Sequence, residues 1–438
     1  MPRGAGRRFF SAGDNPPPET PPERLDIDLE ALALELGTPL YVYSARVIRE
    51  RVRELRAALA GLDATICYAV KANGNLALLG LMAELGIGAD IVSGGELQRC
   101  LRAGVPASRI VFSGVGKTEA EIDEALAAGI ARFNIESPDE LEMLQYLAQQ
   151  RGAVAQAAVR INPDVDARTH AKISTGRSGN KFGVSIAEAR GWFAGSARLT
   201  HVRLDGLHMH IGSQLLSLEP FRLALDRLAS FRRELARAGH TIASVDVGGG
   251  LGVAYRAGHD RPASAAEYVR HIRDALDGFT GRLILEPGRW LVAEAGLLLT
   301  RVIRVKRGGE RRWLVVDAAM NDLPRPSLYD AWHDIVPVAD TSRPPATYDI
   351  VGPVCESADI FARGRELPEC APGELLMIRA TGAYGASMAS TYNARPLAAE
   401  VLVDDGHYAV IRRRQTFEDM IAGEVINPEW QQQANNRL

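Results

Sequence analysis

Residues 66–75 read ICYAVKANGN, an apolar run that leads through Lys71 into a polar turn. The β-branched and aromatic residues of Ile66–Val70 predict a buried strand. Similar apolar runs recur up to about residue 290, with amphipathic helical patterns between them. The further predicted strands are Ala89–Val92, Ile110–Ser113, Phe133–Ile135, Ala157–Ile161, Gly206–His210, Ser244–Val247 and Leu283–Glu286.

Helix start signals lie between several of these runs. Ser137-Pro138-Asp139-Glu140 has the form of a capping box with proline at the first helical position. Ser93–Glu96 and Thr118–Glu121 have the same Ser/Thr-x-x-Glu form. Eight strand-then-helix units in this length predict an α/β fold with a (β/α)8 TIM barrel. A doubly wound open sheet is the alternative that this pattern leaves open.

The pattern changes after about residue 292, where short strands, glycine and proline dominate. Two strand candidates, Leu298–Lys306 and Arg312–Val316, are joined through Gly308-Gly309. Two more, Glu400–Val403 and Tyr408–Arg412, flank Asp404-Asp405-Gly406, which is a strong hairpin signal. We therefore expect a C-terminal all-β domain, either a barrel or a sandwich.

These patterns divide the chain into three parts. Residues 1–24 are expected to form a flexible tail, and residues 41–292 the barrel. Residues 25–40 and 293–438 are expected to form the β domain together. The apolar run Pro39–Tyr43 would then carry the chain from the β domain into the barrel.

The composition excludes several classes of protein. The 51 basic and 54 acidic residues give a net charge of −3, which does not favour nucleic acid or an anionic membrane as partner. No apolar run is long enough to span a bilayer. The four cysteines are widely spaced without a CxxC pair, so we expect a cytoplasmic protein in a reducing compartment.

Lys71 is the first candidate for chemistry. A lysine carried out of a buried strand can bond covalently to an aldehyde cofactor, because desolvation lowers the pKa of its amine. The alternative is a surface lysine that caps the end of a strand. The neighbouring motifs favour the first interpretation.

Glycines follow the last two predicted barrel strands, where barrels commonly bind phosphate. Asp246–Gly252 reads DVGGGLG, and Glu286–Arg289 reads EPGR. Glycines there let backbone N–H groups surround a phosphate without interference from a Cβ atom. The third glycine of a dinucleotide-binding motif would fall on Val253, so that motif is absent. A simple tight turn is the alternative.

His208 and His210 end the sixth predicted strand, and their period-two spacing places both on one face and Met209 on the other. One of them could lie flat against a cofactor ring. Zinc binding is the competing idea, but the sequence offers no further His or Cys cluster to complete a set of ligands, so we predict no metal site. A histidine buried in the core is the plainer interpretation for at least one of them.

Five other side chains offer matching chemistry. Glu286 could keep a pyridine nitrogen protonated, or could form a salt bridge with Arg289. Arg289 and Arg325 could each bind a carboxylate in bidentate fashion. Cys355 could deliver a proton to a carbanion, although most free cysteines are inert. Tyr384, expected in an exposed turn, could bind phosphate or be an ordinary loop tyrosine.

Taken together, these motifs resemble those of the fold-type III pyridoxal-phosphate-dependent decarboxylases, whose barrel is alanine racemase-like. The resemblance covers residues 38 to about 421. It is carried by YAVKANGN (68–75), ADIVSGGEL (89–97), GLHMHIGSQ (206–214), DVGGGLG (246–252), EPGRWLVAEAG (286–296), RPSLYDAWH (325–333), GPVCESAD (352–359) and GAYGASMASTYNARP (382–396). Within the family, these stretches are most similar to the members that convert meso-2,6-diaminopimelate to L-lysine and CO2, the last step of lysine biosynthesis.

The resemblance implies a role for each matching residue. Lys71 would hold pyridoxal 5'-phosphate covalently, His210 would stack on its ring, and Glu286 would bind its pyridine nitrogen. Cys355 would be the proton donor and Glu356 would recognise the distal amino group, both within the neighbouring subunit's active site, so a homodimer is implied. The phosphate ligands would be Ser213, Gly248, Gly249, Gly250, Pro287, Gly288, Arg289 and Tyr384, and the residues around the substrate carboxylates Arg289, Arg325, Tyr329 and Tyr384.

Three alternatives compete with decarboxylation of meso-2,6-diaminopimelate. A decarboxylase of ornithine, lysine or carboxynorspermidine is one, but the amine-selective relatives carry aspartate where this chain has Glu356. A racemase of the same fold usually places arginine, not Glu286, at the pyridine nitrogen. A non-catalytic relative is the third, and the completeness of the site argues against it.

Overall fold

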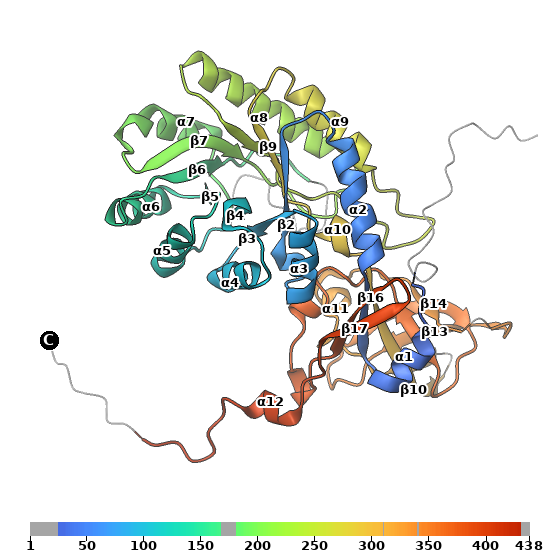
Figure 1. Cartoon of the computed structure of the whole chain (residues 1–438). Coiled ribbons are helices and arrows are strands. Elements are labelled where there is room, and N and C mark those ends of the chain that lie inside the picture. The colour runs from blue at the N-terminus through green and yellow to red at the C-terminus, as the bar shows by residue number, and fades with distance from the viewer. Residues whose placement is uncertain (1–24, 168–180, 310, 340, 431–438) are drawn as a thin grey trace, which may run out of the picture.

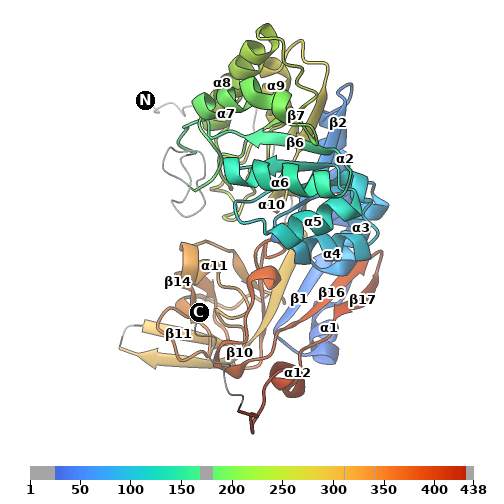
Figure 2. The same ribbon diagram turned by 90° about the vertical axis from the view of Figure 1, so that its left-hand side faces the viewer.

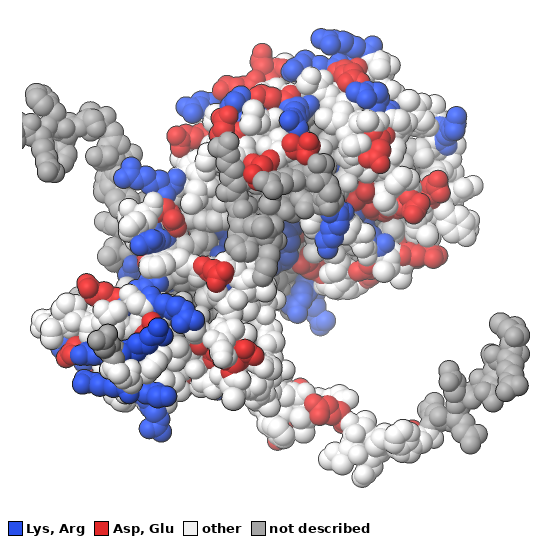
Figure 3. Space-filling view, turned by 180° about the vertical axis from the view of Figure 1, so that it is seen from behind, with Lys and Arg blue, Asp and Glu red and all other residues white. Residues whose placement is uncertain are grey.

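The computed structural model describes residues 25–167, 181–309, 311–339 and 341–430. The predicted tail, residues 1–24, lies outside the described residues. The described chain forms a strand barrel surrounded by helices, and a second, strand-rich part next to it (Figures 1 and 2). Within this part of the chain, no helix is both long and apolar enough to cross a membrane. On the face shown in Figure 3, acidic and basic side chains are interspersed over the larger lobe, whereas basic side chains predominate on the smaller lobe at lower left.

The first part is a closed barrel of eight parallel strands, which confirms the predicted (β/α)8 fold and excludes an open sheet. The circle closes where β9 pairs with β2, with Ala64 opposite Leu283. All eight predicted runs contribute a strand. The strands are β2 (Ala64–Ala69), β3 (Gly88–Ile91), β4 (Ile110–Phe112), β5 (Arg132–Ile135), β6 (Ala155–Arg160), β7 (Val202–His208), β8 (Ser244–Asp246) and β9 (Arg282–Leu285).

Helices surround the barrel (Figure 1). They are α2 (Ala45–Ala58), α3 (Leu76–Glu84), α4 (Gly94–Arg102), α5 (Glu119–Ala128), α6 (Pro138–Gln150), α7 (Ile186–Gly195), α8 (Glu219–Arg237), α9 (Ala265–Ala275) and the short α10 (Arg289–Val292). Of the three predicted capping boxes, only that of Thr118 and Glu121 is complete. Ser93 and Ser137 do cap their helices, but Glu96 and Glu140 accept bonds from the backbone of Val92 and Glu136 instead.

The second part is one nine-stranded sheet with strand order β14-β13-β11-β10-β1-β16-β17, on which β15 pairs with β10 and β12. Its strands are β1 (Leu40–Ser44), β10 (Gly296–Gly308), β11 (Arg311–Val316), β12 (Ile335–Pro337), β13 (Pro345–Val351), β14 (Ile360–Pro368), β15 (Leu375–Ile378), β16 (Ala399–Asp404) and β17 (His407–Arg412). The helices α1 (Leu29–Leu36), α11 (Arg325–Tyr329) and α12 (Phe417–Ile421) accompany it. Both predicted hairpins are present, as β10–β11 and β16–β17.

One predicted boundary is shifted. Residues 41–44, assigned to the barrel from the sequence, lie in β1, which pairs with β10 and β16. All five residues of β1 are buried, so the sheet is where their apolar side chains are removed from water. The division of the chain into domains otherwise stays a prediction.

The sheet part contacts the barrel next to Lys71. The backbone N–H of Tyr384 donates to the carbonyl of Ala72 at 2.8 Å, and the Asn73 side chain donates to the carbonyl of Gly382 at 3.2 Å. A loop that is distant in sequence thereby lies against the turn that follows β2. This contact encloses the space above the carboxyl ends of the barrel strands.

Candidate active site

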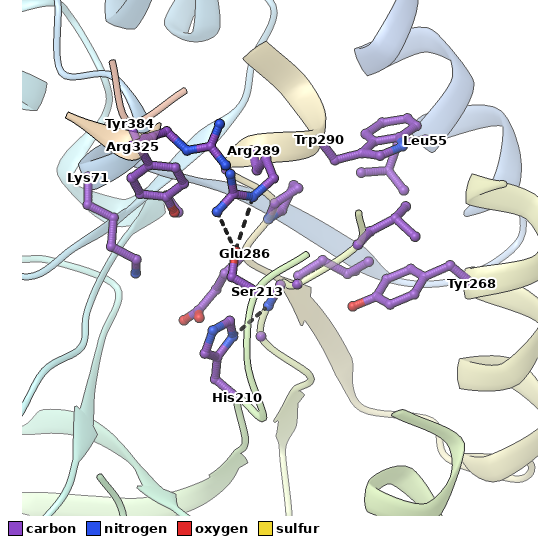
Figure 4. A pocket seen from close by; sticks show the side chains of 18 of the residues that line it. Leu55, Lys71, His210, Ser213, Tyr268, Glu286, Arg289, Trp290, Arg325 and Tyr384 are labelled. Carbon is purple, nitrogen blue, oxygen red and sulfur yellow. Dashed lines mark hydrogen bonds between the residues drawn. The ribbon is translucent and has the colours of Figure 1, made fainter. Parts of the chain in front are cut away.

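A cavity of about 200 Å³ lies at the carboxyl ends of the barrel strands, bounded on one side by the sheet part (Figure 4). Most of the residues predicted for the site line it together. They are Lys71, His210, Ser213, Gly248, Gly249, Gly250, Glu286, Pro287, Gly288, Arg289, Arg325, Tyr329 and Tyr384. An apolar group that was not predicted completes the lining and includes Leu55, Leu251, Tyr268, Leu285 and Trp290.

The strand β2 ends at Ala69 and not at Val70 as predicted. Lys71 lies in the short 3-10 turn that follows, Val70–Ala72. Its Nζ donates a hydrogen bond to Oδ2 of the fully buried Asp90 at 3.0 Å. Burial lowers the pKa of Lys71, but the charge of Asp90, aided by Tyr384 and Glu286, outweighs it and raises the pKa above the ordinary value. The expected lowering was therefore wrong, because the prediction considered desolvation without a counter-ion.

His210 lies two residues beyond the end of β7 and projects into the cavity (Figure 4). Its Nδ1 accepts a hydrogen bond from the N–H of Gly249 at 3.2 Å. Burial, followed by the charges of Arg160 and Lys71, lowers the pKa of His210 to about 3. The ring is therefore neutral at pH 7, and its proton is on Nε2. Met209 and His208 are both buried.

Glu286 follows β9 and is 5% exposed. Its Oε2 accepts from Nε2 of His208 at 3.3 Å, while Oε1 accepts from Asn134 at 3.2 Å and Ser113 at 3.3 Å. Burial raises the pKa of Glu286, but the adjacent His208 more than offsets this and lowers it overall. The alternative salt bridge with Arg289 does not form, because that side chain points to Ser213 and Tyr255.

Asp246 lies next to this network. Its Oδ1 accepts from the N–H of Gly248 at 2.9 Å, and burial, together with the charge of Glu286, raises the pKa of its carboxyl group. Ligand atoms of His208, Asp246 and Glu286 lie within 4.8 Å of one another, close enough for a metal ion. In the structure, His208 is hydrogen-bonded to Glu286, and Asp246 to the N–H of Gly248.

Two arginines face the cavity from different parts of the fold. Arg289, the first residue of α10, donates from Nε and Nη2 to Oγ of Ser213 at 3.2 and 3.1 Å. Its guanidinium also lies 4.7 Å from the ring centre of Tyr384. Arg325 is the first residue of α11 in the sheet part. Each of the two arginines is only 6% exposed, although neither has a carboxylate partner in the described ranges of the chain.

The glycine-rich turn after β8 leaves no room for side chains. A Cβ atom on Gly249 would lie 2.2 Å from the carbonyl oxygen of Glu286. On Gly250, whose φ is +109°, it would lie 2.4 Å from the carbonyl oxygen of Gly212. The backbone here therefore approaches its neighbours as closely as only glycine allows.

Comparisons with known proteins agree with this geometry. The family model described as "Pyridoxal-dependent decarboxylase, pyridoxal binding domain" matches residues 45–293. Diaminopimelate decarboxylase of Pseudomonas aeruginosa is 48% identical over 403 residues, 92% of this chain and 96% of that protein. The enzyme of Zymomonas mobilis is 47% identical over 410 residues, with the same coverage. The chain belongs to the diaminopimelate decarboxylase family.

Solved structures of diaminopimelate decarboxylases have the same fold. That of Helicobacter pylori, complexed with L-lysine, has a TM-score of 0.87 and 43% identity and covers 90% of this chain and 98% of that one. The diaminopimelate decarboxylase of M. jannaschii, also in complex with L-lysine, has a TM-score of 0.87 and 39% identity and covers 92% of this chain and 95% of that one.

The cofactor of this family is pyridoxal 5'-phosphate, and the cavity has the groups to hold it. Lys71 offers the amine, neutral His210 a flat ring, and Glu286 a buried carboxylate. Only glycine allows the close backbone packing at Gly249 and Gly250, and this turn lines the cavity, where backbone N–H groups can bind a phosphate. The residues present therefore fit the cofactor.

Two predicted residues lie outside the cavity. Cys355 and Glu356 are exposed, and the N–H of Cys355 donates to Oδ1 of Asn393 at 3.1 Å. Tyr384, by contrast, is half-buried and not exposed as predicted, because its loop packs against Ala72. Its φ of +57° is in the left-handed region.

The sequence reasoning missed four buried partners of the site: Asp90, Ser113, Asn134 and His208 as the partner of Glu286. The first three are polar residues within or at the end of predicted apolar strands. A polar side chain at such a position requires a buried partner, which is the signal that could have identified them.

Proposed function

We propose that this protein decarboxylates meso-2,6-diaminopimelate to L-lysine and CO2, with pyridoxal 5'-phosphate held on Lys71. The observation that carries the proposal is one cavity that combines Lys71 and Glu286 with two buried arginines. A substrate with two carboxylates supplies the partners that Arg289 and Arg325 lack in the described chain. A monocarboxylate such as ornithine would leave one buried cation unpaired, which is costly.

The chain's own residues hold the cofactor in this proposal. Lys71 is the point of covalent attachment, and the neutral ring of His210 packs against the cofactor ring. The Gly248–Gly250 turn, with Ser213, Pro287–Arg289 and Tyr384, binds the phosphate. Glu286 keeps its charge because its pKa is lowered, so its carboxylate would accept a hydrogen bond from the pyridine N–H and keep that nitrogen protonated. When bound, the cofactor withdraws the electron pair of the bond that breaks at the substrate's α-carbon.

The arginines orient the substrate. Arg289 binds one carboxylate together with Tyr384, and Arg325 with Tyr329 binds the other. Burial of both guanidinium groups excludes water and strengthens these contacts. Lys71 would hold the cofactor when no substrate is bound, and Asp90 orients its amine by accepting a hydrogen bond from Nζ.

Cys355 and Glu356 are assigned to the active site of a second copy of this chain. Both are exposed and neither lines the cavity of their own chain, which supports this assignment. The Cys355 thiol would donate its proton to the carbon that has lost CO2, and Glu356 would bind the distal amino group. The working enzyme is then a homodimer. Four free cysteines support a cytoplasmic location.

The direct test mixes purified protein, pyridoxal phosphate and meso-diaminopimelate and measures CO2 and L-lysine. Lys71→Ala should abolish both products and the absorbance of bound cofactor. Arg325→Ala should raise the KM for diaminopimelate while cofactor absorbance is retained. Ornithine turned over faster than diaminopimelate by the unaltered protein would contradict the proposal.

A further inference from the structure

We infer that Tyr255 and His333 are positioning residues that hold Arg289 and Arg325 in place and thereby set the selectivity for a dicarboxylate substrate. The inference rests on the proposed function. Neither residue was singled out from the sequence. Tyr255 comes from the barrel loop after β8, and His333 from the loop after α11 in the sheet part.

The problem that they solve is electrostatic. Arg289 and Arg325 are both buried on one cavity, and the charge of each disfavours that of the other. Burial is the larger effect, and it lowers the pKa of the Arg325 guanidinium. Two cations in this setting need neutral groups that stabilise and orient them until an anion arrives.

Tyr255 contacts both cations by different means. Its hydroxyl accepts a hydrogen bond from Nη1 of Arg289 at 2.6 Å. Its ring centre lies 4.2 Å from Cζ of Arg325, a cation–π contact. Tyr255 is only 6% exposed, so both contacts are shielded from water. One side chain therefore sets the relative position of the two guanidinium groups.

His333 orients Arg325 through a hydrogen bond. Its Nε2 accepts from Nη1 of Arg325 at 2.6 Å, and its Nδ1 donates to the carbonyl of Arg379 at 2.7 Å. This pattern requires a neutral imidazole with its proton on Nδ1. Burial, with the charge of Arg325 second, lowers the pKa of His333 well below its usual value, in agreement with that state.

The two positioning residues also contact each other. The rings of Tyr255 and His333 meet edge to face, with centres 5.0 Å apart and an angle of 76° between their planes. Their loops continue side by side, because Arg256 lies over the Trp332 ring at 4.4 Å and the N–H of Ala257 donates to Asp334 at 2.9 Å. The barrel and the sheet are therefore joined at the point where they orient the two arginines.

The first test uses His333→Phe, which keeps a ring but removes the acceptor for Arg325. We expect the KM for meso-diaminopimelate to rise on the order of 10–100-fold, as for loss of a hydrogen bond to a charged group. The inhibition constant of L-lysine, which keeps the distal carboxylate, should rise by the same factor. The kcat and the cofactor absorbance should change little. His259→Phe, at an exposed loop residue, is the matched control.

Two further variants separate a positioning role from a purely structural one. His333→Gln offers an oxygen near the position of Nε2, so it should recover most of the lost affinity. In an Arg325→Ala background, His333→Phe should change the KM less than about twofold, since it acts through an arginine that is absent. An additive effect there, or an unchanged KM in His333→Phe alone, would overturn the inference.

Tyr255 is tested by a pair of substitutions. Tyr255→Phe removes only the hydroxyl that binds Arg289, whereas Tyr255→Leu also removes the ring beneath Arg325. The additional rise in KM from Phe to Leu should be about 2–30-fold, the range of a desolvated cation–π contact. Equal KM values for the two variants would contradict the role of the ring. Failure of the unaltered enzyme to use diaminopimelate would instead refute the proposed function.

Discussion

Lys71 and Asp90 form an ion pair at the rim of the barrel, with Nζ and Oδ2 3.0 Å apart. Asp90 is fully buried at the end of β3, whereas 39% of the Lys71 side chain is exposed to the cavity. The pair explains why the amine is charged in the cofactor-free chain despite the burial around it. The amine must lose its proton before it attacks an aldehyde.

Asp90→Asn should therefore make cofactor attachment less dependent on high pH. In the unaltered chain the pKa of Lys71 is raised, so attachment accelerates as the pH rises and the free amine becomes more abundant. Loss of the Asp90 charge removes the largest effect that raises this pKa, so the pKa falls and the acceleration moves to lower pH. The rate of pyridoxal phosphate uptake by the cofactor-free protein, measured by absorbance at several pH values, tests this. Asp123→Asn, at an exposed ion pair, should leave the pH profile unchanged.

His210 should make the cofactor-free protein less stable in mild acid. Its pKa is lowered to about 3, below the usual value near 6.5, so between these values the unfolded chain binds a proton that the folded chain does not. The free energy of unfolding consequently falls as the pH drops from 6.5 towards 3. In His210→Gln, the number of protons taken up on unfolding in this pH range should fall by up to about one, so the free energy of unfolding should depend less steeply on pH. Urea unfolding at pH 7, 6 and 5 measures the free energy of unfolding, and His259→Gln is the control. If this free energy changes with pH equally in His210→Gln and in the unaltered protein, the prediction is wrong.

Gly250→Ala should weaken cofactor binding and destabilise the fold. The added Cβ would lie 2.4 Å from the carbonyl oxygen of Gly212, and the φ of +109° is strained for alanine. Strain of this kind costs on the order of 1–3 kcal/mol. Cofactor retained after dialysis and the melting temperature of the protein are the measurements. Gly116→Ala, where a Cβ meets nothing within 4 Å, should affect neither, and full cofactor retention by Gly250→Ala would contradict the proposed phosphate site.

Cys355 provides a test of the shared active site. Lys71→Ala and Cys355→Ala should each be nearly inactive alone, because one lacks the attachment point and the other the proton donor. Mixed and re-associated, they should recover about a quarter of the unaltered activity, since half of the randomly formed dimers contain one intact site of two. Mixing Lys71→Ala with Glu286→Gln is the control and should recover nothing, because both residues serve the same chain's cavity. No recovery in the first mixture would refute the assignment of Cys355.

Much of the fold was predictable because its signals are local. The alternation of apolar strands and capped helices identified all eight barrel strands, and Asp404-Asp405-Gly406 identified the β16–β17 hairpin. The residues that follow β2, β7, β8 and β9 were expected to meet, since parallel strands end on the same face of a barrel. Lys71, His210, Gly249 and Glu286 do line one cavity.

The kinds of chemical group available at the site thus followed from the order of residues along the chain. Their charge states and orientations did not, because these depend on partners far away in sequence. Asp90 raises the pKa of Lys71 where desolvation was expected to lower it, and His208 replaces Arg289 as the partner of Glu286. Coulomb forces and hydrogen bonds act over a few ångströms of space, whatever the number of residues between the groups. Folding brought these groups within that range. A polar residue in an apolar strand indicates that a buried partner exists, but it does not say which residue that partner is.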